Sequence, residues 1–341
     1  MGSAAPKQLV FLTGGSGFIA SHILEQLLSN DYRVIVTVRS ALKGDKIISS
    51  FPEDTRKDIS YEIIEDIAQD GAYDEAIKSN PSIDYVIHTA SPYHHNLQDP
   101  VKDFLDPAIK GTTGILHSIL KYAPTSVKRV LLLSSTATIL NPSNHAKVYT
   151  EEIYGTTTWE EAIGGPLTYR ASKIYSERAA FEFIEKEKPA FDLVTLNPSL
   201  VFGPPPKHLA SLDALNTSNH RLRDMILGKM RENIAPTGPV HIFVDVRDVA
   251  TAHIRALQIP QASMQRFMIV SDYFSNKRIA DTIRERYPQL KDILPAEDSL
   301  DDFPESIYGF DVSKSKKMLG IEYRDLKTCV NDAVEAMISQ V

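Results

Sequence analysis

Short apolar runs alternate with segments of helical periodicity along the first 200 residues. The apolar runs cover residues 8–13, 32–38, 60–64, 83–89, 129–133 and 191–196. Between them, apolar positions recur every three or four residues, which predicts helices over 18–29 and 101–122. Strands that are apolar throughout and alternate with helices are typical of a parallel sheet covered on both faces. We therefore predict a doubly wound parallel α/β sheet.

This alternation ends after Asn197-Pro198, where a rigid Gly203-Pro204-Pro205-Pro206 segment and a polar stretch follow. Beyond it, the pattern predicts a strand at 240–244 and helices near 221–230, 249–257, 276–286 and 325–338. We expect residues 7–198 to form mainly the sheet domain. Residues 199–341 should form mainly a smaller mixed α/β lobe, with some segments returning to the core. Such a lobe would cover the carboxyl edge of the sheet, where open α/β sheets bind ligands.

A glycine-rich turn lies between the first predicted strand and the first predicted helix. It has the sequence Thr13-Gly14-Gly15-Ser16-Gly17-Phe18-Ile19-Ala20. Gly14 allows a tight turn, Gly17 allows the backbone to approach a pyrophosphate at the helix N-terminus, and Ala20 allows close contact between helix and sheet. The turn therefore predicts a Rossmann-type dinucleotide-binding domain with Gly14, Gly17, Phe18 and Ile19 at the cofactor.

The end of the second predicted strand indicates which dinucleotide is bound. An enzyme that uses NAD needs a carboxylate there for the ribose 2′-hydroxyl, whereas a 2′-phosphate needs a cation. This chain has Thr37-Val38-Arg39-Ser40 and then Lys43, with no carboxylate in the segment. We therefore predict NADP(H), with Arg39 and Lys43 at its 2′-phosphate.

Tyr169 and Lys173 are four residues apart, so on a helix both side chains would share one face. The lysine charge would stabilise the phenolate and make the tyrosine a usable proton donor to a carbonyl oxygen near neutral pH. Ser135, which follows the fifth predicted strand, would supply a hydroxyl beside the same oxygen. Together with the glycine turn, the three residues predict a hydride-transfer site.

Composition and charge argue against several other classes of protein, such as nucleic-acid-binding, metal-binding and membrane proteins. The net charge is −7 and there is no basic stripe, so we expect no nucleic-acid partner. Cys329 is the only cysteine, which excludes an internal disulfide and a cysteine-rich metal site. Adjacent His94 and His95 would point to opposite sides of an extended chain, so no metal is predicted. No apolar stretch approaches ~18 residues, and we expect a cytoplasmic protein with no membrane partner, as a monomer or homodimer.

Eight motifs in this order resemble the extended short-chain dehydrogenase/reductase family, and within it the fungal methylglyoxal/isovaleraldehyde reductases and the plant dihydroflavonol and cinnamoyl-CoA reductases. They are TGGSGFIA at 13–20, TVRS at 37–40, EDIA at 65–68, HTASPY at 88–93, VKRVLLLSS at 127–135, YRASK at 169–173, NPSLVFGP at 197–204 and FVDVRDVA at 243–250. The resemblance covers nearly the full chain. It implies that Ser135, Tyr169 and Lys173 are the catalytic set, with Thr136 the alternative to Ser135.

The same resemblance implies further site residues. Cofactor-binding positions would be Asp66 and Ile67 beside the adenine, Thr89, Ala90 and Ser91 beneath the ribose and nicotinamide, and Pro198 and Val201 at the nicotinamide amide. Substrate-pocket positions would be Tyr93, Thr136, Leu140, Pro166 and Leu200. Because relatives often carry aromatic residues where this chain has Thr136, Leu140 and Leu200, the resemblance implies a roomier pocket that suits bulky ketones.

We therefore expect an NADPH-dependent carbonyl reductase that converts aldehydes and ketones to alcohols. One alternative is a nucleotide-sugar epimerase or dehydratase of the same fold. Those enzymes usually keep NAD, and dehydratases place an acid beside the catalytic hydroxyl, where this chain has Thr136-Ala137-Thr138. The other alternative is a non-enzymatic NADP(H) sensor, and such sensors tend to lose the Tyr169/Lys173 pair that is intact here.

Overall fold

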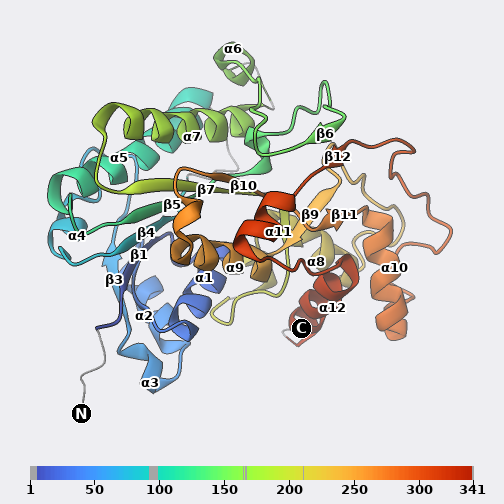
Figure 1. Ribbon diagram of the computed structural model, residues 1–341. Helices are drawn as coiled ribbons and strands as arrows, with labels where there is room; N and C mark the ends of the chain where they lie inside the picture. The colour runs from blue at the N-terminus through green and yellow to red at the C-terminus, as the bar shows by residue number, and fades with distance from the viewer. Residues whose placement is uncertain (1–5, 92–98, 164, 166, 210, 340–341) are drawn as a thin grey trace.

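A seven-stranded parallel sheet forms the centre of the molecule in the computed structural model, which describes residues 6–91, 99–163, 165, 167–209 and 211–339 (Figure 1). Its strand order is β10-β7-β5-β4-β1-β2-β3, and each neighbouring pair is parallel. The strands are β1 (Leu9–Thr13), β2 (Arg33–Val38), β3 (Ile59–Ile63), β4 (Tyr85–His88), β5 (Arg129–Leu133), β7 (Asp192–Pro198) and β10 (Arg266–Ile269). The predicted doubly wound α/β fold is confirmed.

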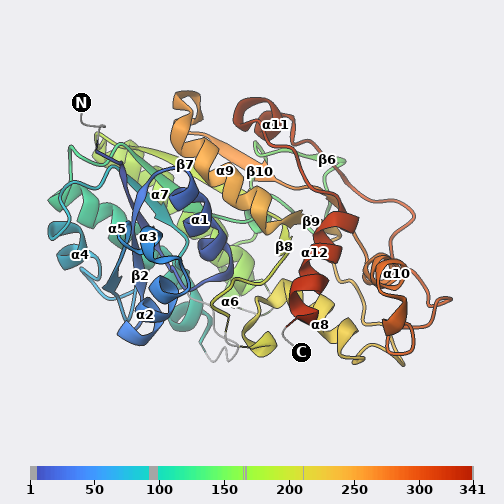
Figure 2. The ribbon, with the colours of Figure 1, turned by 90° about the horizontal axis from the view of Figure 1, so that it is seen from below.

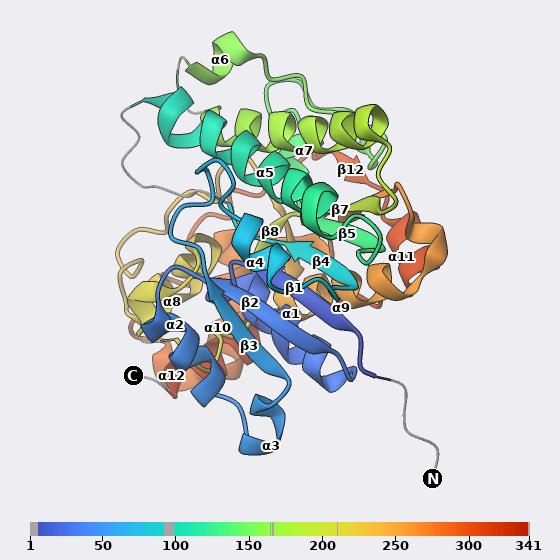
Figure 3. The ribbon, with the colours of Figure 1, turned by 90° about the vertical axis from the view of Figure 1, so that its left-hand side faces the viewer.

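Long helices cover both faces of this sheet. Figures 1 and 3 show α5 (Asp106–Tyr122) and α7 (Thr168–Glu187) on one face, and α1 (Phe18–Ser29) and α9 (Val246–Gln258) on the other. Shorter elements connect them. These are α2 (Ala41–Ser49), α3 (Glu53–Arg56), α4 (Asp74–Lys78), the π-helical turn η1 (Val101–Leu105), the 3₁₀ turns η2 (Thr136–Thr138) and η5 (Pro260–Ala262), and α6 (Trp159–Ile163).

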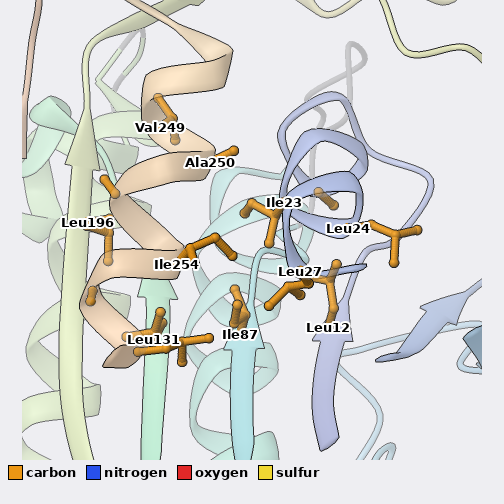
Figure 4. Close-up of a cluster of buried hydrophobic side chains, with 14 of the residues drawn as sticks. Leu12, Ile23, Leu24, Leu27, Ile87, Leu131, Leu196, Val249, Ala250 and Ile254 are labelled. Atoms are coloured by element: carbon orange, nitrogen blue, oxygen red, sulfur yellow. The ribbon is translucent and has the colours of Figure 1, made fainter. Parts of the chain in front are cut away.

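The core under α1 and α9 holds these two helices against the sheet. Figure 4 shows side chains from four strands meeting side chains from both helices, and Figure 2 shows the two helices running over the same face. Leu12, Ile87, Leu131 and Leu196 come from β1, β4, β5 and β7, and Ile23, Leu27 and Ile254 from the helices. Truncating one such leucine to alanine typically costs ~2–5 kcal/mol, so the start of α1 is held firmly at the edge of the sheet.

The smaller lobe lies beyond the carboxyl edge of the sheet and has its own core. It contains the strands β8 (Leu200–Phe202), β9 (Ile242–Asp245) and β11 (Asp272–Tyr273), which form a three-stranded sheet. Its helices are α8 (His220–Ile226), α10 (Asn276–Arg286) and α12 (Leu326–Ile338), with 3₁₀ turns η3 (Leu212–Ala214), η4 (Thr217–Asn219) and η6 (Pro288–Leu290). The helix α11 (Ser313–Leu319) packs instead against α9 and β10 of the large sheet. A two-stranded sheet joins β6 (Val148–Tyr149) to β12 (Gly309–Phe310). The rings of Phe202, Phe243 and Phe274 pack together in the core.

Five strands were missing from the sequence-based pattern, and three of them, β6, β11 and β12, have only two residues each. β8 has only three residues, and β10 has four and begins with an arginine, so neither shows a long apolar run. β10 nevertheless adds to the edge of the large sheet beside β7, with Arg266 opposite Thr195. The chain after residue 199 therefore contributes to the large sheet as well as to the lobe.

The order of the strands reverses at β1, which pairs with β2 on one side and with β4 on the other. The chain leaves these strands in opposite directions, and in doubly wound sheets the resulting crevice is where ligands bind. The loops after β1 and β4 are therefore the first place to look for a site.

Two glycines provide a test of the packing around this crevice. A Cβ on Gly15 would lie 2.6 Å from the Cβ of Val36 on β2, whereas a Cβ on Gly114 in α5 would meet nothing within 4 Å. Gly15→Ala should lower the free energy of unfolding by ~1–3 kcal/mol because the turn must move away from β2. Gly114→Ala should raise it by ~0.5–1 kcal/mol through helix propensity. Denaturant unfolding of both variants measures this, and equal effects would contradict the packing described.

Candidate active site

The glycine turn after β1 presents backbone to the crevice. Gly14 has φ +71°, and a Cβ there would lie 3.1 Å from the Cα of Ala90. The Gly17 N–H donates to the Gly14 carbonyl at 2.8 Å. Gly17 is also the N-cap of α1 and no side chain caps that end, so the first N–H groups of the helix are available to an anion. These features fit a pyrophosphate.

Thr13 joins the glycine turn to the loop after β4. Its Oγ1 accepts hydrogen bonds from the N–H groups of Thr89 at 3.1 Å and Ala90 at 3.0 Å, and lies 2.9 Å from Nδ1 of His88. With both N–H groups donating to it, the hydroxyl donates to His88. Burial lowers the pKa of His88 to about 3, so its ring is neutral with the proton on Nε2. The segment containing Thr89 and Ala90 is thus fixed against the glycine turn.

A cavity of about 490 Å³ opens beside the ends of β2 and β3. It is lined by Arg39, Asp66 and Ile67, three of the positions predicted for the adenosine half of the cofactor. Asp66 Oδ1 accepts a hydrogen bond from the Ala68 N–H at 2.9 Å, which fixes the turn after β3. Lys43 is exposed on α2 and does not line this cavity.

Further cavity-lining residues come from η1 and α5, on the opposite wall. Lys102 and Lys110 add two cations that sequence reasoning missed, and Asp103 and Asp106 add two carboxylates. Gly111 on the same helix faces Ile67, whose Cδ1 would lie 3.0 Å from an added Cβ. The spacing of apolar positions in the sequence does not indicate that η1 and α5 line this cavity. Their place in its wall depends on how α5 packs over the loop after β3.

Tyr169 and Lys173 both lie on α7, as the spacing predicted. Tyr169 is 42 % exposed, which leaves its side chain accessible to a ligand. Lys173 is partly buried, and its Nζ donates to Ser91 Oγ at 3.3 Å. Burial lowers the pKa of Lys173 to about 8, against the opposing effect of the Glu177 carboxylate. The contact with Ser91 connects α7 to the loop that Thr13 holds.

Ser135 begins the η2 turn directly after β5. Its Oγ accepts a hydrogen bond from the Ala137 N–H at 3.1 Å, so its own proton stays available for donation. Ser135 is partly exposed, whereas Thr136 is only 4 % exposed. Arg170, next to Tyr169 on α7, donates to the Ala137 carbonyl at 3.0 Å. The start of α7 is therefore tied to the turn that carries Ser135.

Three of the remaining predicted positions, Pro198, Leu200 and Val201, lie at or just after the end of β7. Pro198 ends that strand, and Val201 in β8 is buried. Leu200 is partly buried and pairs with Phe243 of β9. Leu140 is 1 % exposed and packs in a cluster with Tyr149 and Met268, so its side chain offers almost no surface to a substrate. Tyr93 and Pro166 lie outside the described residues.

His208 is another residue that sequence reasoning missed. Its Nε2 lies 3.3 Å from Ser21 Oγ on α1, and the segment before it is held by a 3.0 Å contact between His22 Nε2 and the Pro204 carbonyl. The segment 204–208 therefore runs against the first turns of α1. A histidine in a proline-rich polar segment carries no sequence signal for such a contact, which joins positions far apart in the chain.

The described residues contain no group of three or more His, Cys, Asp or Glu side chains that could hold a metal ion. None of the helices in this part of the chain is long and apolar enough to cross a lipid bilayer.

Comparisons with known proteins connect this geometry to a family. The sequence profile of the NAD dependent epimerase/dehydratase family matches residues 10–269. The chain is 59% identical to the ketoreductase azaE of Aspergillus niger over 340 residues, which is 100% of both chains. It is 34% identical to the NADPH-dependent methylglyoxal reductase GRE2 of Saccharomyces cerevisiae, over 96% of this chain and 98% of that protein. The crystal structure of Gre2 from Candida albicans in complex with NADPH superposes with a TM-score of 0.91, at 36% identity, covering 98% of this chain and 99% of that one.

The lowered pKa of Lys173 predicts an effect on stability. Its charged form is disfavoured in the folded protein, so Lys173→Met should raise the free energy of unfolding of the cofactor-free protein by ~1–3 kcal/mol at pH 7. Between pH 8 and 10.5 the unfolded chain binds the extra proton, so the wild-type protein becomes more stable as pH rises and the difference should shrink. Denaturant unfolding of both proteins at pH 7 and pH 10 checks this. A variant that is less stable than wild type at pH 7 would contradict the burial cost.

Proposed function

Because the chain belongs to the NAD dependent epimerase/dehydratase family, we propose that it is an NADPH-dependent carbonyl reductase within that family. It reduces the carbonyl group of aldehydes and ketones to an alcohol. The observation that carries this proposal is one continuous series of contacts. It runs from the glycine turn through Thr13 to the loop after β4, and from Ser91 to Lys173 on the helix that carries Tyr169. The names of the ketoreductase and methylglyoxal reductase relatives support it.

The residues around the crevice fit NADP(H). The uncapped start of α1 and the close approach of Gly14 to Ala90 suit a pyrophosphate. Arg39 at the end of β2 lines the cavity where a 2′-phosphate would need a cation. Asp66 and Ile67 would hold the adenine from the end of β3, and Pro198 and Val201 would hold the nicotinamide end.

The protein groups then act on the carbonyl oxygen of the substrate. NADPH, when bound, supplies a hydride to the carbonyl carbon. Tyr169 donates its phenolic proton to the oxygen, on which negative charge develops. Ser135 donates a hydrogen bond to the same oxygen, and its exposure relative to Thr136 favours it for that role. The ammonium of Lys173 stabilises the phenolate that remains on Tyr169.

The preferred class of ketone, the cellular location and the oligomeric state are also proposals. Leu200 in β8 is aliphatic and only partly buried, and we infer a pocket that accepts ketones with two bulky groups. The single cysteine, Cys329, is consistent with a reducing compartment, and we place the protein in the cytoplasm. The assembly as a monomer or homodimer stays a prediction.

The role of Tyr169 can be tested with a matched pair of variants. Tyr169→Phe should lower kcat for the reduction of an aryl ketone by ~10²-fold or more, because the proton donor is lost. Its affinity for NADPH, measured by fluorescence titration, should stay close to wild type. Tyr175→Phe removes a hydroxyl from the same helix, where the ring packs edge-on against Trp159, and should change kcat by less than about twofold. Near-normal turnover of Tyr169→Phe would refute the mechanism.

Cofactor preference depends on Arg39. Arg39→Ala should weaken NADPH binding by ~1.5–3 kcal/mol, because a charged hydrogen bond to the 2′-phosphate is lost, and should leave NADH binding nearly unchanged. Arg33 is exposed at the other end of β2, so Arg33→Ala is the control and should alter neither affinity. Calorimetric titration with both cofactors measures the difference. Equal losses for NADPH and NADH on replacing Arg39 would contradict the assignment.

A further inference from the structure

Glu177 is a carboxylate with almost no access to solvent, in the middle of α7. Its side chain is 1 % exposed, and its Oε1 accepts a hydrogen bond from Arg266 Nε at 2.7 Å. Its Oε2 accepts hydrogen bonds from Asn197 Nδ2 at 2.7 Å and from Ser134 Oγ. These partners come from β10, from β7 and from the residue after β5. A single side chain of α7 is thus bonded to three neighbouring strands or strand ends of the sheet.

The same network reaches the backbone of Ser135. Asn197 Nδ2 also donates to Thr138 Oγ1 at 2.9 Å, and Thr138 Oγ1 donates to the Ser135 carbonyl at 2.9 Å. On the other side, Ser134 is the chain neighbour of Ser135 and donates to Glu177 directly. The backbone of Ser135 is therefore held from both sides by groups that end on one carboxylate.

Further contacts hold the guanidinium of Arg266 in place beside Glu177. Its Nη2 donates to Thr138 Oγ1 at 3.2 Å, and its Nη1 donates to the carbonyls of Ile153 at 3.2 Å and of Glu151. The ring of Tyr154 lies over the guanidinium, with 3.7 Å between Cζ and the ring centroid. Arg266 therefore cannot turn away from Glu177 without losing several hydrogen bonds.

Glu177 also acts on Lys173, which lies one helical turn earlier on the same face of α7. The titratable groups near Lys173 include Tyr169 one turn earlier on α7, His88 at the end of β4, and Glu177. The ring of His88 is neutral near pH 7, because burial lowers its pKa to about 3. The carboxylate of Glu177 is therefore the charge that offsets the cost of burying the ammonium of Lys173.

We propose that Glu177 is a positioning residue for the reduction: its carboxylate fixes the backbone of Ser135 relative to α7 and keeps Lys173 in the ammonium form. This inference rests on the proposed function for the roles of Ser135 and Lys173. It assigns Glu177 no contact with substrate or cofactor. Ser135 and Lys173, which lie on different elements, would then be aligned by one buried group.

The charge of Lys173 can be measured without cofactor or substrate. Acetic anhydride acylates only neutral amines, so peptide mass spectrometry across pH 6–10 gives the titration midpoint of Lys173, expected at about 8 in the wild-type protein. Glu177→Gln keeps the shape of the side chain but removes its charge, and should lower this midpoint by about 0.5–1 pH unit. The exposed Lys121 serves as the reference in the same digests. A midpoint equal to that of wild type overturns the proposal.

The control is a second ion pair, between a buried arginine and a half-buried aspartate, at the opposite end of β5 and β7. Arg129, at the start of β5, donates from Nε and Nη2 to Asp192, at the start of β7, at 2.7 and 2.8 Å. Asp192→Asn also leaves a buried arginine without its carboxylate, so it should reproduce any general loss of stability. It should leave the Lys173 midpoint and kcat unchanged. If Asp192→Asn shifts the midpoint as far as Glu177→Gln does, the effect is structural and the proposal fails.

Kinetic measurements separate the effect of Glu177 on the backbone of Ser135 from its effect on the charge of Lys173. At pH 7.5, Glu177→Gln should lower kcat about tenfold and change KM for NADPH less than about twofold. Ser134→Ala removes one donor to Glu177 but leaves the charge, so it should lower kcat about threefold or more without moving the Lys173 midpoint. Unchanged kcat in Ser134→Ala overturns the part concerning Ser135.

Absence of carbonyl reduction by the wild-type protein would refute the proposed function, while the acylation result would still decide whether Glu177 sets the charge of Lys173.

A variant that removes the whole ion pair covers the case in which Glu177→Gln does not fold. Replacing a buried ion pair by apolar side chains of similar size is often tolerated, so Glu177→Met combined with Arg266→Met should fold by circular dichroism. Its Lys173 midpoint should again be lower than in wild type, by a smaller amount because a cation has been removed as well. An unchanged midpoint in this double variant counts against the proposal in the same way.

Discussion

The parallel direction of the strands is the constraint on which the site depends. Every strand of the large sheet runs the same way, so the residues that follow the strands collect at one edge. Gly14 follows β1, Arg39 follows β2, and Ser135 comes shortly after β5. At this edge the backbone groups no longer pair with a neighbouring strand and can bind a ligand or a side chain instead. Residues more than a hundred positions apart therefore meet without any local signal between them.

Burying charge at this edge is costly, and the structure shows how the cost is offset. A partly buried ammonium such as Lys173 is unfavourable unless an opposite charge lies nearby. Glu177 supplies that charge, but its own burial needs a partner, which is Arg266 from β10. Because apolar replacements of buried ion pairs are often as stable, the pair is better explained by the alignment it imposes than by stability. The short strand β10 thus matters to the site although none of its residues was expected there.

Much of the fold could be predicted because its signals are local. The apolar runs gave the strands β1 to β5 and β7, and the spacing of Tyr169 and Lys173 placed them on one helix, which the structure shows as α7. Residues whose role depends on distant partners could not be predicted. Glu177 on a helix would ordinarily face water, and Arg266 only precedes a short apolar run, so neither residue stands out alone. Only their pairing across the fold explains why both are buried.

The chemistry at the η2 turn separates the reductase from the other activities of the same fold. A dehydratase needs an acid beside the catalytic hydroxyl, whereas this turn carries Thr136 and Thr138. Thr136 is only 4 % exposed, and the hydroxyl of Thr138 donates to the Ser135 carbonyl. The carboxylate of Glu177 lies on the sheet side of this turn, where it is paired with Arg266 and accepts a hydrogen bond from Asn197. A carboxylate that accepts these hydrogen bonds does not act as the acid that a dehydratase needs.

In the proposed reduction, proton donation therefore falls to Tyr169, which is 42 % exposed and lies on the same helix as Lys173. A sensor could hold the cofactor with the glycine turn and Arg39 alone. A lysine one helical turn from the tyrosine, with a pKa that burial lowers to about 8, instead fits the proposed proton transfer to a carbonyl oxygen near neutral pH.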